Sequence, residues 1–284
     1  MNIKDQPVGV FDSGVGGLTV AREIFRNLPN ERILYYGDTA RVPYGNKSPE
    51  TIQRYSRQIA GFLISKGVKA IVIACNTASA LALESVQEMT DIPVIGVVKP
   101  GAAAAVRETR TGRIGIIGTS ATIGSGIYDK YIKELRPDAE IFGRACPLFV
   151  HLVEEGIIDD PVTAVMIHRY LDDMINKSRI DTLILGCTHY PLLRGIIARE
   201  IGGTFAGQDH PSQASPAQGI TLVNPAYTAA MELKALLEEK GLSSDPGQHI
   251  DHEFYASDSP ESFRRFASHI LEMDIPDVRL NVLE

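Results

Sequence analysis

Two stretches, "IVIACNTASA" at residues 71–80 and "LILGCTHYPL" at residues 183–192, decide how we interpret this chain. Each is a short apolar run followed by a cysteine and then by the start of a helical pattern. Such runs, alternating with helices, are typical of a parallel sheet covered on both faces. A second pair of similar stretches, "GVFDSG" at 9–14 and "GIIGTS" at 115–120, has nearly the same spacing along the chain. The sequence therefore predicts two copies of one α/β unit.

We expect an α/β fold of two pseudo-symmetric, doubly wound domains with mainly parallel sheets. Ligands bind beyond the carboxyl ends of the strands in open sheets of this kind. The two cysteines, in equivalent turns of the two domains, suggest groups that face each other across a cleft, and the active site is expected there. The first domain is predicted to comprise residues 1–98 and 209–284, and the second residues 99–208. The polar segment 205–219, rich in Pro and Ser, is interpreted as a surface loop at the crossing.

Composition limits the class of protein. The 284 residues carry a net charge of −7, with 44% hydrophobic and 22% charged residues, which is typical of a globular protein. The acidic balance argues against a surface that binds nucleic acid or an anionic membrane. The start, "MNIKDQPVGV", lacks the apolar core of a signal peptide, and the apolar runs are too short to cross a bilayer. We therefore expect a cytoplasmic protein.

Start and stop signals locate several elements. Ser48, with Pro49 after it, is predicted to cap a helix that stops at Gly67. A single helix is expected near 124–136 in the second copy. The link "VKPG" at 98–101 is interpreted as a hinge between the copies.

Polar residues follow each strand at the edge where a ligand would bind. They offer hydroxyls, an amide and backbone N–H groups at helix starts, which are suited to an anion. The glycine turn "DSGVGGLT" lacks both the Lys of a phosphate loop and the G-x-G-x-x-G spacing. A carboxylate is therefore favoured over a polyphosphate. The turns concerned are Asp12-Ser13-Gly14, Gly37-Asp38, Cys75-Asn76-Thr77, Gly118-Thr119-Ser120 and Cys187-Thr188-His189.

The three cysteines fall into two kinds. Their odd number and the absence of C-x-x-C spacing argue against a disulfide framework and against zinc. Cys146 precedes a proline and is expected to be core filler. Cys75 and Cys187 each follow an apolar strand and precede a helix start, where the pKa of a thiol falls below about 8.5. Two thiols in equivalent places favour a pair that removes a proton from one face of a carbon and returns one to the other.

Five motifs, with a short sixth stretch, stand in order along the chain: "FDSGVGGLTV" (11–20), "YYGDTARVPYG" (35–45), "ACNTASA" (74–80), "CPLFVHLVEEG" (146–156), "LGCTHYPLL" (185–193) and "LVNPA" (222–226). Together they resemble the glutamate racemases of the aspartate/glutamate racemase family. The resemblance implies a bacterial isomerase, without cofactor or metal, that interconverts L- and D-glutamate and supplies D-glutamate for peptidoglycan, and so for cell shape. It also implies a homodimer.

The resemblance also implies a role for individual residues. Cys75 and Cys187 would be the thiolate base and thiol acid, and Asp12, Glu154 and His189 would assist them. Thr119 and Thr122 are further candidates for substrate contacts. The implied substrate-binding residues are Asp12, Ser13, Tyr44, Gly45, Asn76, Thr77, Thr188 and His189.

Some alternatives remain open. The chain has His151 where the family usually has Pro, which changes the local backbone entry and weakens the assignment of Glu154. Separately, Glu154 and the neighbouring Glu155 are not distinguished by sequence, so Glu154 as an ordinary surface acid is an alternative. Another superfamily member such as an aspartate racemase is a close alternative. A redox or carboxylate-binding protein with two switchable thiols is an alternative from another class. The segment "HIDH" at 249–252 suits no zinc pattern and is expected to be surface.

Overall fold

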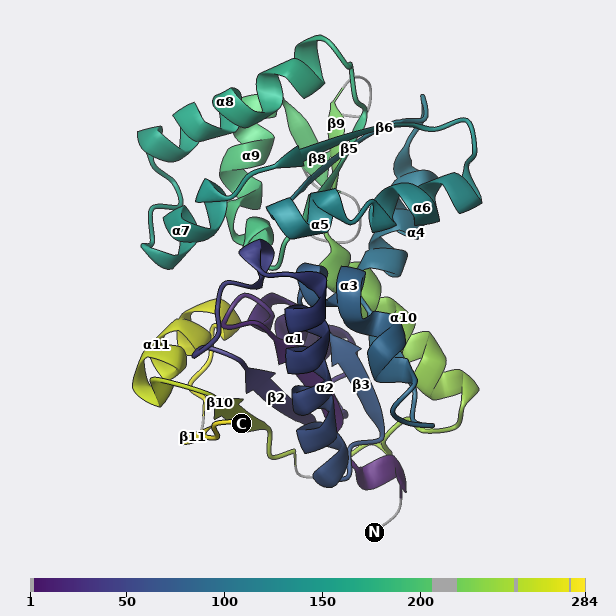
Figure 1. Ribbon diagram of the computed structural model, residues 1–284, viewed down its shortest axis with the longest axis vertical. Helices are drawn as coiled ribbons and strands as arrows, with labels where there is room; N and C mark the ends of the chain where they lie inside the picture. The colour runs from purple at the N-terminus through teal and green to yellow at the C-terminus, as the bar shows by residue number, and fades with distance from the viewer. Residues whose placement is uncertain (1–2, 206–218, 248–249, 276, 284) are drawn as a thin grey trace. The chain divides into compact units, whose positions relative to one another are not determined.

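The computed structural model describes residues 3–205, 219–247, 250–275 and 277–283 (Figure 1). The chain forms two compact units, Met1–Val97 with Ala226–Glu284, and Val98–Pro225. The boundary after Pro225 differs from the expected return at residue 209. The reason is that a strand at Ile220–Val223 pairs within the second sheet, so the chain leaves the second unit only after it. Most of the polar segment, residues 206–218, lies outside the described residues.

The first unit is built on one six-stranded parallel sheet. Its strands are β1 (Val8–Asp12), β2 (Ile33–Gly37), β3 (Ala70–Ile73), β4 (Val94–Gly96), β10 (Glu253–Ala256) and β11 (Val278–Leu280). Its helices are η1 (Ile3–Asp5), α1 (Leu18–Asn27), η2 (Tyr44–Asn46), α2 (Pro49–Ser65), α3 (Asn76–Gln87), α10 (Pro225–Glu239) and α11 (Pro260–Leu271).

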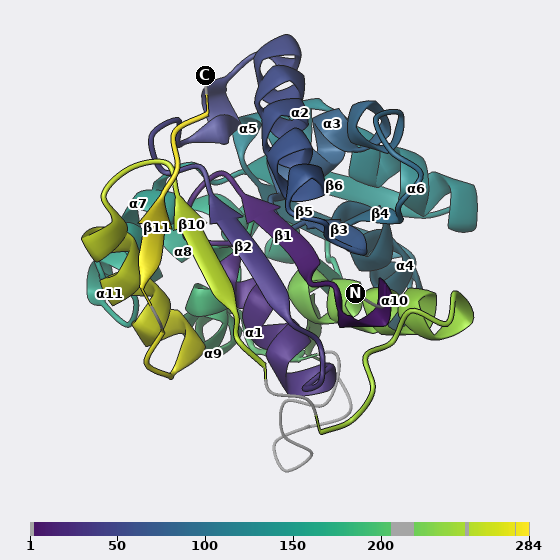
Figure 2. The ribbon, with the colours of Figure 1, turned by 90° about the horizontal axis from the view of Figure 1, so that it is seen from below.

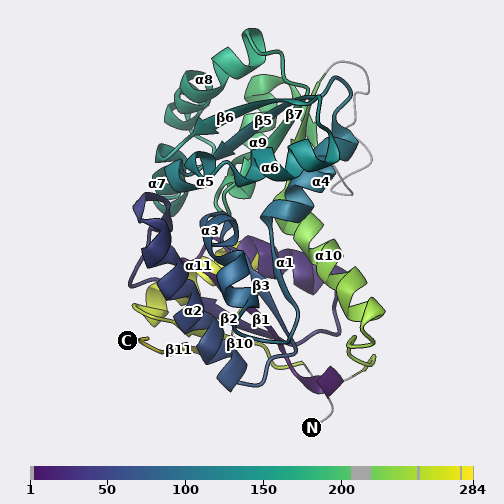
Figure 3. The same ribbon diagram turned by 45° about the vertical axis from the view of Figure 1, so that its right-hand side comes forward.

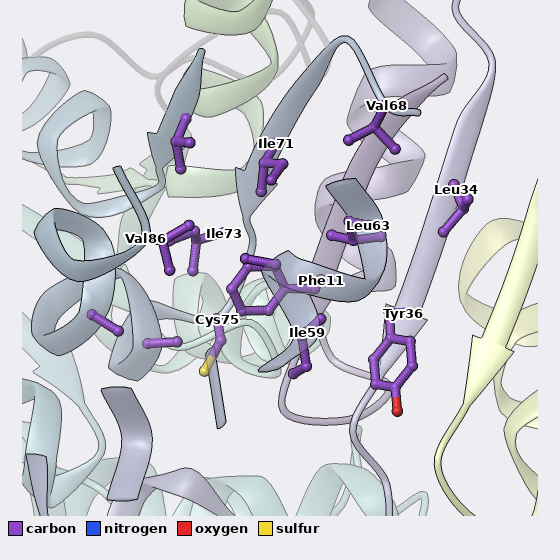
Figure 4. Close-up of a cluster of buried hydrophobic side chains, with 14 of the residues drawn as sticks. Phe11, Leu34, Tyr36, Ile59, Leu63, Val68, Ile71, Ile73, Cys75 and Val86 are labelled. Atoms are coloured by element: carbon purple, nitrogen blue, oxygen red, sulfur yellow. The ribbon is translucent and has the colours of Figure 1, made fainter. Parts of the chain in front are cut away.

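The strands of this sheet run in the order β11-β10-β2-β1-β3-β4. Figure 2 shows α2 on one face of the sheet and α1 with α11 on the other. The residues facing α2 form a buried cluster that includes Phe11, Tyr36 and Ile73, together with Leu63 of α2 (Figure 4). Cys75 belongs to the same cluster, so the residue after β3 is anchored by the core of its own unit.

The second unit contains a five-stranded parallel sheet in the order β6-β5-β7-β9-β8. Helices α4 and α6 pack together, as do α8 and α9, and Figure 3 shows the two pairs on opposite faces of the sheet. The strands are β5 (Arg113–Gly118), β6 (Glu140–Ala145), β7 (Thr182–Gly186), β8 (Gly203–Phe205) and β9 (Ile220–Val223). The helices are α4 (Val98–Glu108), α5 (Ser120–Gly124), α6 (Ile127–Leu135), α7 (Leu148–Glu154), α8 (Pro161–Asn176), η3 (Tyr190–Leu193) and α9 (Arg194–Ile201).

The first three strands of the two units share one strand order. In the first sheet β2, β1 and β3 are neighbours in that order, as are β6, β5 and β7 in the second. Strands β3 and β7, which precede Cys75 and Cys187, occupy the same place in this order. The predicted fold class, two related doubly wound α/β units with parallel sheets, is therefore confirmed, and the two thiols hold equivalent topological positions.

Local signals predicted some helices well and others poorly. Ser48 caps α2 as expected, its hydroxyl accepting from the Thr51 N–H at 3.4 Å. The single helix expected near 124–136 is instead two, because Gly126 adopts φ +64° and separates α5 from α6. The expected hinge at 98–101 lies in the first turns of α4. Among the described residues, none of the helices has the length and apolar character needed to span a membrane.

Candidate active site

Strand register brings the functional turns of the first unit to one edge. Asp12 of β1 is paired with Gly37 of β2, and Gly37 is paired with Ala256 of β10. Phe11 is paired with Ile73, so the residues that follow β3 lie at the same edge as Asp12. The polar residues at these strand ends are therefore neighbours because parallel strands end together.

The glycine turn closes tightly around Asp12. The Gly14 N–H donates to Asp12 Oδ2 at 2.9 Å, and the Asp12 side chain is fully buried. A Cβ at Gly17 would lie 2.4 Å from Asp12 Cβ and 2.7 Å from the Tyr35 hydroxyl oxygen, so only glycine fits there. The glycines of this turn thus let the chain pack against a carboxylate.

Cys75 stands at the N-cap of α3 and is 5% exposed. Its thiol donates to the Ser13 hydroxyl, with Sγ and Oγ 3.6 Å apart. Asn76 and Thr77 begin α3, and both are buried. The backbone N–H groups of this first turn favour negative charge beside them. The first unit therefore brings Asp12, Ser13 and the start of α3 together around one thiol.

A second buried carboxylate, Asp38, lies beside this group and was not among the expected site residues. Its side chain is fully buried. Arg41 Nε donates to both Asp38 oxygens, at 2.9 and 2.7 Å, and the Ser257 hydroxyl donates to Oδ1 at 2.9 Å. The Tyr44 hydroxyl donates to Oδ2. Sequence signals pointed to the turn after β2 but could not show that residue 257 closes it.

Tyr44 and Gly45 lie in η2, within the loop that follows β2. Burial, then the charge of Asp38 and the hydrogen bond to it, raises the pKa of Tyr44 far above its ordinary value. The hydroxyl therefore stays protonated and donates to Asp38. The ring is buried and packs against Tyr55 of α2, with centroids 5.8 Å apart.

The second unit arranges a row of three side chains. Cys187 follows β7 and is 6% exposed. Its Sγ lies 3.8 Å from His189 Nδ1, and His189 Nε2 lies 3.2 Å from Glu154 Oε1. Thr188, between the cysteine and the histidine, is also buried. The arrangement can move a proton to or from a thiol and stabilise the charge left on the imidazole.

Glu154 ends α7, and its side chain is 35% exposed. The hydrogen bond from His189, with the charges of His189 and His151, holds the pKa of Glu154 below its ordinary value, although burial opposes this. His151 is accommodated inside α7, so it does not prevent the helix from presenting Glu154. Of the two adjacent acids, Glu154 is the one that contacts His189.

Other residues of the second unit frame this row. The Tyr190 hydroxyl donates to the carbonyl oxygens of Gly118 and Cys146, at 3.1 and 2.8 Å, and so ties the turn to the ends of β5 and β6. Thr119 caps α5, and its hydroxyl lies 3.0 Å from that of Thr122. Cys146 is fully buried, as expected, and burial raises the pKa of its thiol well above the usual range.

Within the described ranges, no group of three or more His, Cys, Asp or Glu side chains is placed to hold a metal ion. The "HIDH" segment, expected at the surface, is partly buried at His252. Its Nδ1 accepts the Ile33 N–H at 3.2 Å, and its ring lies 4.2 Å from that of Phe25. The segment was misjudged because its neighbours come from distant parts of the chain. His249 lies outside the described residues.

Known proteins resemble this chain over most of its length. A family model described as "Asp/Glu/Hydantoin racemase" matches residues 9–227. The chain belongs to this family. A glutamate racemase of Geobacter metallireducens is 45% identical over 271 residues, covering 95% of this chain and 94% of the relative. One of Persephonella marina is 58% identical over 192 residues, covering 68% and 73%.

Solved structures support the same membership. The crystal structure of glutamate racemase from Francisella tularensis in complex with D-glutamate has a TM-score of 0.88 and 36% identity, covering 99% of both chains. An aspartate racemase of Picrophilus torridus has a TM-score of 0.54 at 17% identity, covering 83% of this chain and 94% of its own, and shows the shared fold alone. The resemblance inferred from the motifs, and the racemase class that it implied, are confirmed.

Proposed function

We propose that this chain is a glutamate racemase that interconverts L- and D-glutamate by proton transfer at Cα between two thiols, Cys75 and Cys187. The observation that carries the proposal is their topological equivalence. Each thiol follows the same strand of the shared strand order, and each is buried beside polar groups suited to proton transfer. A lone nucleophile has no need of such a duplicate.

In this mechanism one cysteine, as thiolate, removes the α-proton from one face of Cα and becomes a thiol. The other cysteine, as thiol, donates a proton to the opposite face and becomes a thiolate. The reverse direction exchanges the two roles, so no other acid or base is consumed. The thiols supply both functions, and no cofactor enters the step.

The surrounding residues support each transfer. His189, backed by Glu154, assists Cys187, whereas Asp12, Ser13 and the start of α3 assist Cys75. The substrate carboxylates are held by hydroxyl and amide groups at the turns, and donors aimed at developing charge lower the barrier. The residues proposed to hold the carboxylates are Ser13, Asn76, Thr77, Thr188 and His189, with Tyr44 and Gly45 through the backbone N–H groups of their turn. Asp12 accepts the substrate ammonium.

The cellular role follows from this activity. The glutamate racemases that resemble this chain come from bacteria. The role we propose is to supply D-glutamate for peptidoglycan. A cytoplasmic location and a homodimer are parts of the same proposal. Its partners would be the amino acid and a second copy of the chain, with neither nucleic acid nor membrane.

The experiment is a measurement of optical rotation or circular dichroism with L-glutamate, D-glutamate, L-aspartate and D-aspartate supplied separately. We expect both glutamate enantiomers to reach one racemic mixture and the aspartates to turn over far more slowly. Faster turnover of aspartate would contradict the assignment of substrate. Reversible loss of free thiols in air, with racemisation of neither amino acid, would instead favour the redox alternative.

A further inference from the structure

The loop between β2 and α2 is tied down by an unusual concentration of buried polar contacts around Asp38. Its carboxylate receives the Arg41 guanidinium, the Ser257 hydroxyl and the Tyr44 hydroxyl. Ser257 in turn accepts the Ala40 N–H at 2.8 Å. One buried carboxylate therefore connects the first half of the loop, residues 38–44, to Ser257, the residue that follows β10.

We call Asp38, Arg41, Tyr44 and Ser257 the Asp38 network. Further contacts connect this network to α2 and to the turn after β10. Arg41 Nη1 donates to Gln58 Oε1 at 2.6 Å, and its guanidinium lies 4.1 Å from the centre of the Tyr55 ring. The Thr39 hydroxyl donates to the Asp258 carbonyl oxygen at 2.7 Å. Burying a charge costs free energy unless the charge is paired and hydrogen-bonded. The partners of Asp38 are Arg41 and Tyr44 from the loop and Ser257 from the turn after β10.

We propose that Asp38 is a positioning residue for glutamate binding, which acts by holding the Tyr44 hydroxyl and Arg41 so that the loop carrying Tyr44 and Gly45 keeps one conformation. The inference rests on the proposed function, which places that loop at the substrate. The Asp38 carboxylate is hydrogen-bonded to Arg41, Tyr44 and Ser257, and its effect on the substrate passes through Tyr44. It therefore fixes where substrate binds and leaves the proton transfers to the cysteines.

The first test is Tyr44→Phe, which removes only the hydroxyl that donates a hydrogen bond to Asp38. If the loop contributes equally to binding the substrate and the transition state, disturbing the loop should raise KM and leave kcat nearly constant. We expect KM to rise about 3- to 10-fold for both glutamate enantiomers, with kcat within about twofold, since one hydrogen bond to a charged group is lost.

Tyr255→Phe is the matched control. Tyr255 is also buried, and its hydroxyl also donates to a carboxylate, Glu253 Oε2 at 3.0 Å, but outside the Asp38 network. We expect its KM to equal that of the wild type. Equal KM values for the Tyr44 and Tyr255 variants, or a Tyr44→Phe effect confined to kcat, would overturn the positioning role.

A second readout does not depend on activity. Asp38→Asn leaves Arg41 without its carboxylate, so the loop should open more often and expose the Arg41–Val42 bond to trypsin. We expect cleavage there, followed by mass spectrometry, to be about tenfold faster than in Tyr255→Phe under conditions where both variants are folded. An unchanged cleavage rate would contradict the proposal that the Asp38 network holds the loop.

These outcomes separate the two proposals. Absence of glutamate racemisation in the wild type would remove the proposed function. Normal wild-type racemisation together with a Tyr44→Phe variant that behaves like Tyr255→Phe would remove only the role of Asp38.

Discussion

At the scale of single residues, the row from Cys187 through His189 to Glu154 shows how the fold selects one acid from two. Glu154 and Glu155 are adjacent and identical in chemistry, and both follow the same apolar pattern. The end of α7 directs Glu154 to His189 Nε2 at 3.2 Å. A carboxylate in this position orients the imidazole and stabilises the positive charge that the imidazole carries when it takes up a proton.

This arrangement predicts different effects for the two acids. Glu154→Gln keeps the shape but removes the charge that supports His189, so we expect kcat to fall about 5- to 10-fold, which is typical of losing one partly exposed charged hydrogen bond. Glu155→Gln, the matched control, should retain kcat within about twofold. Initial rates from each enantiomer measure both. Equal losses in the two variants would contradict the assignment of Glu154.

At the scale of elements, glycine conformations decide where helices break. The pattern near 124–136 is apolar at helical spacing, yet Gly126 at φ +64° divides it into α5 and α6. Gly124, two residues earlier, ends α5 with an ordinary φ. Sequence cannot distinguish these glycines, because both are preceded and followed by residues that accept a helix.

The two glycines should therefore respond in opposite ways to alanine. In both, a new Cβ meets nothing within 4 Å, so only backbone conformation matters. Gly126→Ala forces a side chain into the left-handed region and should lower the free energy of unfolding by about 1 kcal/mol. Gly124→Ala should be neutral or raise it by up to about 1 kcal/mol. Urea denaturation measures both; a stabilised Gly126→Ala would refute the break.

At the scale of the whole molecule, each unit is completed by segments distant in the chain. Asp38 and Ser257 are 219 residues apart, and they meet because β10 is paired with β2. His252, just before β10, likewise accepts the Ile33 N–H and packs on Phe25 of α1. These long-range contacts make the stability of the first unit depend on groups that local patterns place at the surface.

His252 predicts a specific loss of stability in acid. Burial lowers its pKa from 6.5 to about 4, so below pH 6.5 the unfolded chain binds a proton that the folded chain does not. The free energy of unfolding therefore decreases as the pH is lowered from about 6.5 to about 4. From pH 7 to pH 4.5 the loss attributable to His252 is about 2 kcal/mol, reduced from the full shift because the ring is partly exposed.

The measurement is urea unfolding of the wild type and His252→Gln at both pH values. The variant loses packing at either pH, but it should lose about 2 kcal/mol less than the wild type on acidification. Equal losses in the two proteins would show that His252 titrates normally in the folded state.

The sequence predicted those features that local patterns encode. The cysteines at strand ends and the cap at Ser48 follow from residues near one another, and the repeated unit follows from the similarity of two such local patterns. The Asp38 network, the environment of His252 and the inclusion of β9 in the second sheet required strand pairings between distant segments, which no local pattern specifies. The roles of the site residues remain predictions.

The most direct test of the two-thiol mechanism is racemisation in deuterated water with three single variants, Cys75→Ala, Cys187→Ala and Cys146→Ala. The mechanism predicts that the first two lose interconversion of L- and D-glutamate while keeping native circular dichroism. Cys146→Ala, which removes a buried thiol of the core, should still interconvert the enantiomers and place deuterium at Cα. Full interconversion by Cys75→Ala or Cys187→Ala would contradict the mechanism.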